Sequence, residues 1–207
     1  KDTQDRQRNC AEWRDRLGSD VNQDDIYKIQ YSTKPERFQT AYKEETLQET
    51  FEGNTFIKAL LKPVNKPLLE YFVFAKEMEY EGNPQDSNWE SWDDNAPRSY
   101  WDLPEDTTGV DYKTLLPIQK RLDACKDTFL QQRYAFMLIR YGKRDNVKPL
   151  YNKYFANENV KSVAKAWATL FYAYATEDKA EQNYWLSKCF DLCNEKVIAV
   201  ALSLIHI

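Results

Sequence analysis

Four glutamates gather in residues 43–52, and paired carboxylates are the groups with which many enzymes carry out acid–base chemistry. They are Glu44, Glu45, Glu49 and Glu52. A carboxyl group acts as a general acid near neutral pH only when burial raises its pKa. The remaining residues of this segment are too polar to provide a desolvated site. We therefore interpret the segment as the solvated face of a helix.

The four cysteines are a second set of residues with possible chemistry. Cys189 and Cys193 are four residues apart, so they share one face of a helix and could supply half of a zinc shell. Zinc needs four ligands, and no further cysteine or histidine lies near these two in the sequence. Cys10 and Cys125 also fall on apolar faces, where a small hydrophobic residue is the commoner role. We favour packing for all four, with metal binding and disulfides as alternatives.

Histidine chemistry depends on His206, which is the single histidine of the chain. It lies in residues 202–207, a tail that is similar to a translated sequencing adapter and that we exclude from the native protein. Catalytic triads that use histidine are then excluded, and so are the glycine-rich phosphate loops, because the chain holds 5 glycines. Asp93, Asp94 and Asp102 leave a carboxylate-only glycosidase open. We predict a protein that is not an enzyme and binds no cofactor or metal.

Residues 82–109 interrupt the helical pattern with prolines and large aromatic rings. Trp89, Trp92 and Trp101 lie among Asp and Asn residues, an arrangement with which many proteins stack and hydrogen-bond a sugar ring. Long loops are also often functional. A carbohydrate-binding role for these three rings is therefore our alternative function. We favour the interpretation that they cover the end of a helical stack, because ordering so long a loop requires buried apolar area.

Composition favours an all-α protein of 207 residues. The chain is 42% apolar and 30% charged with few glycines, which suits long solvated helices better than the many turns of a sandwich or barrel. Its net charge is -4 with both signs intermixed, so we expect no nucleic-acid partner. No apolar run is long enough to span a bilayer. The first residue is Lys1, and we interpret the chain as a piece of a longer product.

Helical spacing and capping residues predict a series of helices in order along the chain. We expect an N-terminal helical region over residues 1–81, the insertion over 82–109, helix pairs over 110–201 and the tail over 202–207. The expected helices cover residues 10–17, 24–31, 35–42, 56–61, 68–80, 112–125, 129–141, 146–155, 160–176 and 179–193. The capping residues proposed for them include Asn22 or Asp24, Asn54, Asp127 or Thr128, Asp145 or Asn146, and Asn159.

The last four helices contain one pattern that occurs twice at a spacing of about 33 residues. The matched pairs are Ala135 with Ala168, Val147 with Ala180, and Tyr151 with Tyr184. We expect the small residues to lie where helices cross most closely and both tyrosines to fill the space between layers. Two-residue turns require antiparallel helices, so the pattern predicts antiparallel helix pairs stacked as a short solenoid with one long Trp-rich loop.

The chain resembles the tetratricopeptide family in a degenerate form. The resemblance lies in this spacing and in the small and large residues at the matched positions. The family's closing proline is missing after Ala156. The resemblance implies a scaffold that binds a protein or peptide on the surface of its successive first helices. The polar and ring-bearing residues that we expect to point from that surface are Gln132, Arg140, Lys165, Thr169 and Tyr172.

The whole chain also resembles helical-repeat envelope proteins of anaerobic gut bacteria. The resemblance covers a helix at residues 66–72, the Trp-rich interruption at 89–101 and the small-residue helix at 166–168. It implies a partner-binding role in the bacterial periplasm or in association with the outer membrane.

Overall fold

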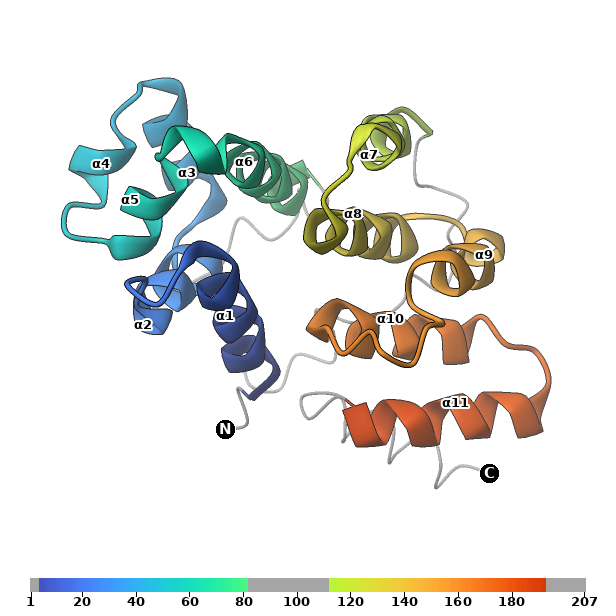
Figure 1. Ribbon diagram of the computed structural model, residues 1–207. Coiled ribbons are helices and arrows are strands. Elements are labelled where there is room, and N and C mark those ends of the chain that lie inside the picture. The colour runs from blue at the N-terminus through green and yellow to red at the C-terminus, as the bar shows by residue number, and fades with distance from the viewer. Residues whose placement is uncertain (1–3, 82–111, 193–207) are drawn as a thin grey trace, which may run out of the picture. The chain divides into compact units, whose positions relative to one another are not determined.

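The computed structural model describes residues 4–81 and 112–192, and the regular elements in these two ranges are all helices, which confirms the all-α prediction (Figure 1). Contacts divide the chain into two compact units. One comprises residues 6–97, and the other comprises residues 98–207 together with 1–5. The insertion expected at 82–109, the tail at 202–207 and Cys193 lie outside the described residues.

The N-terminal unit consists of short helices whose starts follow the capping residues in the sequence. The side chain of Asn22 accepts a hydrogen bond from the backbone N–H of Asp24, and that of Asn54 accepts one from Ile57. Pro35 occupies the first turn of its helix. The elements are α1 (Gln4–Leu17), α2 (Gln23–Tyr27), the π-helix η1 (Lys28–Ser32), α3 (Pro35–Lys43), α4 (Leu47–Thr50), α5 (Thr55–Leu60), the 3-10 helix η2 (Pro63–Asn65) and α6 (Lys66–Glu81).

Aromatic rings fill the core of this unit. Trp13 of α1 is buried and packs edge-on against Phe56 of α5 at 5.6 Å and against Phe72 of α6 at 5.9 Å between ring centroids. Phe72 in turn contacts Phe38 of α3 at 5.3 Å. Phe72 of the helix expected over residues 68–80 is therefore part of the core. It links α1, α3 and α5 to one helix.

A lysine that no motif in the sequence indicates interrupts the buried side of α6. Lys76 is 2% exposed. Its ammonium group donates hydrogen bonds to the backbone oxygens of Gln30 at 2.7 Å and Thr33 at 3.4 Å, and it lies 3.0 Å from a carboxylate oxygen of Glu79. These two carbonyl groups lie in and just after η1, where a helix end leaves carbonyls without backbone donors. Lys76 of α6 thus provides hydrogen-bond donors to the backbone carbonyls at the end of the π-helix.

Replacing Lys76 with methionine should lower the free energy of unfolding of this unit by about 1–3 kcal/mol, because the carbonyls of Gln30 and Thr33 would lose a buried donor. The matched control is Lys66→Met on the same helix. Its exposed pair with Glu70 has a separation of 3.9 Å, so we expect a change below about 0.5 kcal/mol. Urea unfolding followed by circular dichroism measures both values. Equal stabilities of the two variants would contradict this role for Lys76.

The C-terminal unit contains five described helices. Asp127, Ser162 and Asp178 accept hydrogen bonds from backbone N–H groups at the starts of three of them. Contacts join α7 to α8, α8 to α9 and to α10, and α10 to α9 and to α11. The helices are α7 (Tyr112–Ala124), α8 (Thr128–Tyr141), α9 (Arg144–Tyr154), α10 (Val163–Tyr174) and α11 (Lys179–Leu192).

Two of the predicted helix starts in this unit were wrong. The helix that we expected to begin at residue 145 or 146 begins at Arg144, and its N-cap Lys143 makes no side-chain hydrogen bond. The predicted cap Asn159 instead takes part in a turn, in which its backbone N–H donates to the side chain of Asn157. Short polar side chains favour turns as well as caps. The N-cap of this helix is therefore Ser162, and the helix begins at Val163.

Candidate functional site

Helix α10 is the centre of the C-terminal unit, because three of its faces contact three other helices. One face is lined by Ala166, Leu170 and Ala173 and packs with buried residues of α11. A second carries Phe171, whose ring lies 5.9 Å from that of Phe136 on α8. The third carries Thr169, which approaches α9. A helix that is apolar almost all round is typical of such a buried position.

An aromatic cluster joins α9, α10 and α11. Tyr151 of α9 lies 4.8 Å from Tyr172 of α10 and 5.6 Å from Trp185 of α11, and the rings of Tyr172 and Trp185 are 4.4 Å apart. The hydroxyl of Tyr151 is 3.1 Å from that of Thr169. Burial raises the pKa of Tyr151, so its phenol stays protonated. The cluster is a packed junction.

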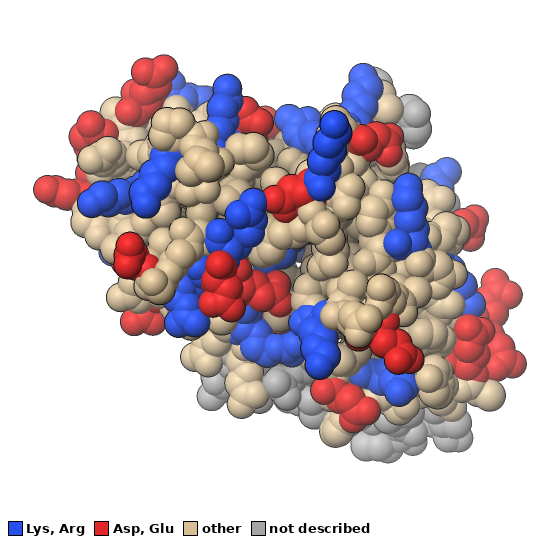
Figure 2. Space-filling view, in the orientation of Figure 1, with Lys and Arg blue, Asp and Glu red and all other residues tan. Residues whose placement is uncertain are grey.

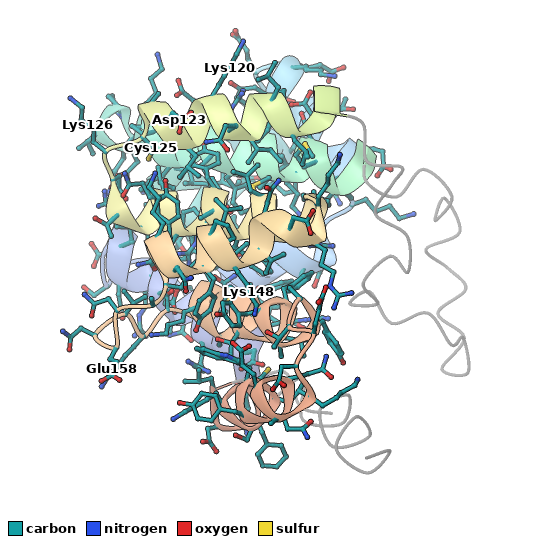
Figure 3. All side chains as sticks on the ribbon, turned by 90° about the vertical axis from the view of Figure 1, so that its right-hand side faces the viewer. Lys120, Asp123, Cys125, Lys126, Lys148 and Glu158 are labelled. Atoms are coloured by element: carbon teal, nitrogen blue, oxygen red, sulfur yellow. The ribbon has the colours of Figure 1, made fainter. Side chains whose placement is uncertain are left out.

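Charged groups cover one side of this cluster. The Lys148 ammonium lies 5.3 Å from the centre of the Tyr172 ring and 3.4 Å from a carboxylate oxygen of Glu181 on α11 (Lys148 is labelled in Figure 3). Both side chains of the ion pair are partly exposed. Such a pair adds little stability, but it ties α9 to α11 across the cluster.

The structure does not bring the five predicted groove residues together on one open surface. Thr169 is 0% and Tyr172 is 7% exposed, so the prediction that they point from the surface was wrong. Lys165 is half-buried and donates to the backbone oxygen of Asn157 at 2.8 Å, and burial lowers its pKa. Residues 165, 169 and 172 share one face of α10, and α9 with its following turn covers that face.

The two predicted groove residues on α8 lie in half-buried positions. Gln132 is half-buried, and the guanidinium of Arg140 lies 5.1 Å from the ring of its neighbour Tyr141. Whether these two side chains or Lys165 bind a partner stays a prediction.

The positions matched at a spacing of about 33 residues agree in burial between α8 and α10 and differ between α9 and α11. Ala135 and Ala168 are both fully buried, as predicted. Tyr151 is buried, whereas its sequence counterpart Tyr184 is 55% exposed, so the prediction that both fill the core was wrong.

The lengths of the two connections explain this difference. Residues 142–143 join α8 to α9, whereas residues 175–178 join α10 to α11. Successive residues of a helix are about 100° apart around its axis. A connection that is one residue longer therefore changes which residues of the following helix face its neighbours. Trp185 and Leu186 consequently take the inward positions on α11, and Ala180, which we had matched with Val147, is exposed.

The described cysteines are free thiols. Cys10 and Cys189 are buried among apolar residues, in agreement with a packing role, and burial raises the pKa of Cys10 to about 12. Cys125 is half-buried just after α7, and its thiol donates to the backbone oxygen of Asp127 (Figure 3). Within residues 4–81 and 112–192, no three His, Cys, Asp or Glu side chains are placed to hold a metal ion.

Iodoacetamide should therefore alkylate Cys125 of the native protein well before Cys10 or Cys189 at mildly alkaline pH. Alkylation requires an accessible thiolate. Burial raises the pKa of both Cys10 and Cys125, but Cys10 is 1% exposed whereas Cys125 is only half-buried. Peptide mass spectrometry of timed samples measures the rates, and urea-unfolded protein provides the fully reactive control. Equal rates for Cys10 and Cys125 in the native protein would contradict the packing role.

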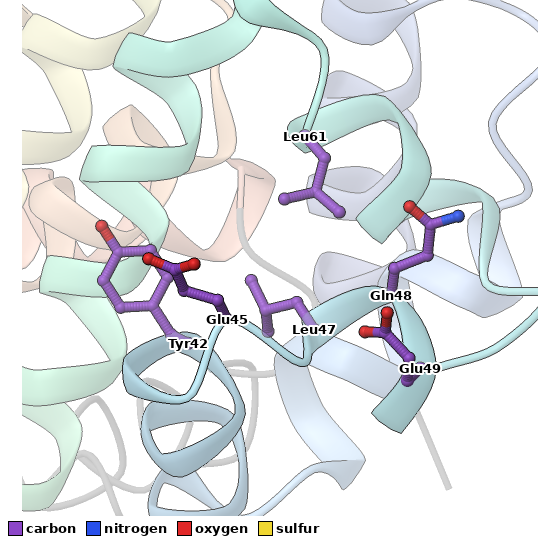
Figure 4. Close-up of a pocket in the computed structure, with 6 residues that line it drawn as sticks. All are labelled: Tyr42, Glu45, Leu47, Gln48, Glu49 and Leu61. Atoms are coloured by element: carbon purple, nitrogen blue, oxygen red, sulfur yellow. The ribbon is translucent and has the colours of Figure 1, made fainter.

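A shallow hollow of about 240 Å³ lies on the N-terminal unit and is lined from α3, α4 and α5 with their connections (Figure 4). We call it the acidic hollow. The side chains of Leu47 and Leu61 point toward each other in its middle, and Tyr42 and Glu45 are among the residues that line it. Its lining residues are Tyr42, Glu45, Leu47, Gln48, Glu49 and Leu61.

The acidic hollow corrects part of the interpretation of residues 43–52. We expected these residues to form one solvated helix, but α3 ends at Lys43 and α4 contains only residues 47–50. Glu45 lies between the two helices with a φ of 59°, in the left-handed region that glycine normally occupies. No turn residue in this stretch signals the break, which is why the sequence did not reveal it.

Comparisons with protein-family models, with curated proteins and with solved structures found no match for this chain. The two resemblances drawn from its sequence therefore stay predictions. So does carbohydrate binding by Trp89, Trp92 and Trp101, which lie outside the described residues.

The distribution of charged side chains on the surface agrees with the intermixed basic and acidic residues of the sequence. Basic and acidic side chains alternate over the visible face without a large field of one sign (Figure 2). Among the described helices, none is both long and apolar enough to cross a membrane.

Proposed function

We propose that this chain is a non-enzymatic scaffold of stacked antiparallel helix pairs, similar to tetratricopeptide units, that binds a protein or peptide partner. The observation that supports it most is the position of α10, which contacts both helices of the preceding pair and its own partner α11. A helix pair that cannot bury its apolar face alone and completes its core with the next pair is the defining feature of such repeats.

Contacts also join the first helices of the two pairs, α8 and α10. Ala135 on α8 and Ala168 on α10 are fully buried at matching positions, with the Phe136 ring packed against Trp167 at 5.6 Å. Small residues beside large rings let two helices approach closely. The short connection at residues 142–143 favours an antiparallel arrangement of α8 and α9.

Repeat stacks of this kind serve as rigid surfaces for binding peptides. The faces of α10 are used in packing, so the binding surface of this scaffold has to lie elsewhere. The acidic hollow supports the proposal, since it combines exposed apolar side chains with the carboxylates of Glu45 and Glu49.

Panning a displayed library of random peptides on the immobilised full chain tests this function. We expect enrichment of related sequences that bind the chain in solution at a 1:1 ratio with a Kd near the micromolar range, about -8 kcal/mol. Immobilised chain unfolded by heat serves as the control surface. A library that shows no enrichment over this control would contradict a peptide-binding scaffold.

A further inference from the structure

We infer that the side of α11 that carries Phe190 is the docking surface for the segment that follows it, residues 196–201, and that this segment begins a third helix pair. The inference rests on the proposed stack of helix pairs and adds one element to it. Three observations carry it, namely an uncovered side of α11, an incompletely closed core layer and a third occurrence of the residue spacing.

Helix α11 is packed on two of its sides and uncovered on a third. Leu186 and Cys189 are buried against α10, beside which α11 lies in Figure 1, and the Trp185 ring is 5.6 Å from that of Tyr151 on α9. Phe190 follows Trp185 by five residues, which places it about 140° around the helix axis and away from α9. Its side chain is 46% exposed. The described residues therefore leave this side of α11 open.

The core layer between α10 and α11 is incompletely closed at its edge. Two of the five large apolar side chains that are exposed in the described residues, Tyr184 and Phe190, lie on α11. An end unit of a helical stack needs a polar outer face to stay in solution, so this edge is typical of an internal unit that a further element covers. The partly buried apolar side chains around the layer are Trp167, Tyr174, Trp185 and Leu192.

The sequence places a copy of the α10 pattern directly after α11. At the spacing of 33 residues that relates Ala135 to Ala168, the next position is Ala201. Ala199 likewise matches Ala166, which lies in the core layer between α10 and α11. The tail at 202–207 is not needed for this match. The segment is apolar throughout after Lys196, with the residues Val197, Ile198, Ala199, Val200 and Ala201.

The preceding pair shows how such a segment would pack. Tyr151 of its second helix is covered by the first helix of the next pair, where the rings of Tyr151 and Tyr172 are 4.8 Å apart. A helix rises about 1.5 Å per residue, so Phe190 lies about 3 Å along the axis from Leu192, and a chain that turns back over residues 193–195 brings residues 197–201 level with it. The segment is thus both apolar and within reach of the open side of α11.

Hydrogen exchange of the full chain, measured by mass spectrometry of peptides that cover residues 193–201, tests the inference. We expect the amides of residues 196–201 to exchange at least about ten-fold more slowly than in a synthetic peptide of the same sequence, because docking protects them. Phe190→Ser should raise their exchange rate roughly five- to ten-fold, since less apolar area is then buried on docking. Unchanged protection of α8 and α10 shows that the stack of this variant is still folded.

Tyr184→Ser is the matched control, because it removes the other exposed aromatic ring of α11, about 120° around the axis from Phe190 and farther from Leu192. We expect it to leave the exchange of residues 196–201 unchanged. Replacing Leu202, Leu204 and Ile205 with serine should also preserve their protection, which separates the segment from the tail.

A reciprocal variant serves if Phe190→Ser loosens α10. Replacing Val197, Ile198 and Val200 with serine changes no described residue, and it should raise the labelling of Phe190 by hydroxyl radicals while that of Tyr184 stays the same. Equal labelling of Phe190 in this variant and the wild type would count against docking.

Exchange of residues 196–201 at the rate of the synthetic peptide would overturn the inference, and so would protection that survives Phe190→Ser or falls equally in Tyr184→Ser. Protection that appears only at high protein concentration would overturn it too, because a second copy would then cover α11. Such failures leave the binding of library peptides intact, whereas a library with no binders removes the scaffold function and leaves docking of the segment measurable.

Discussion

Replacing Tyr151 with alanine is expected to lower the free energy of unfolding of the C-terminal unit by about 3–5 kcal/mol, the range for removing a buried aromatic ring. The ring is 2% exposed and contacts Tyr172, Trp185 and Phe155. Its loss would open a cavity where three helices meet. It would also leave the buried Thr169 hydroxyl without the Tyr151 hydroxyl beside it.

Tyr184→Ala is the matched control, since the sequence spacing alone makes the two tyrosines equivalent. The ring of Tyr184 is exposed and touches Trp185 at 5.5 Å and the Lys188 ammonium at 5.5 Å, so we expect a loss below about 1 kcal/mol. Urea unfolding of both variants, followed by circular dichroism, gives the two values. Losses of equal size would mean that the repeat of 33 residues extends to the second helices after all.

Enlarging Ala168 to leucine should lower the free energy of unfolding of the same unit by about 1–3 kcal/mol. Ala168 is fully buried on α10, and the three added carbon atoms find no space without moving a neighbouring helix or distorting neighbouring rotamers. Ala135→Leu on α8 should have a similar effect, because it occupies the matching buried position.

Ala180→Leu provides the comparison for this overpacking. Ala180 was matched with a buried residue by sequence spacing, but the structure places it in the exposed first turn of α11. Alanine and leucine have similar helix propensities, so we expect a change within about 0.5 kcal/mol. If Ala168→Leu were tolerated as well as Ala180→Leu, the close crossing of α8 and α10 would be refuted.

Features set by local chemistry were predictable from the sequence. Asn22, Asn54 and Asp127 cap the helices that follow them, because a short polar side chain can accept a hydrogen bond from a backbone N–H two or three residues later. The burial of Cys10 and Cys189 followed from their positions on apolar faces. Both kinds of inference need only residue types within one or two helical turns.

Features set by neighbouring elements were not predictable in the same way. Thr169 and Tyr172 are polar enough to suggest a surface, and their burial depends on α9 lying over that face of α10. Lys76 is buried where it donates to a carbonyl of η1, which lies far from it in the sequence. The acidic hollow depends on a left-handed glutamate, a conformation that the sequence gives no reason to expect.

Amide hydrogen exchange of the full chain, measured by mass spectrometry over residues 128–192, tests most directly whether the two helix pairs form one stack centred on α10. Amides of α8 and α10 should be the most protected in this range, and their exchange should become equally sensitive to urea because both require opening of the whole stack. Rapid exchange of α10, or exchange of α10 that is independent of α8, would contradict the account.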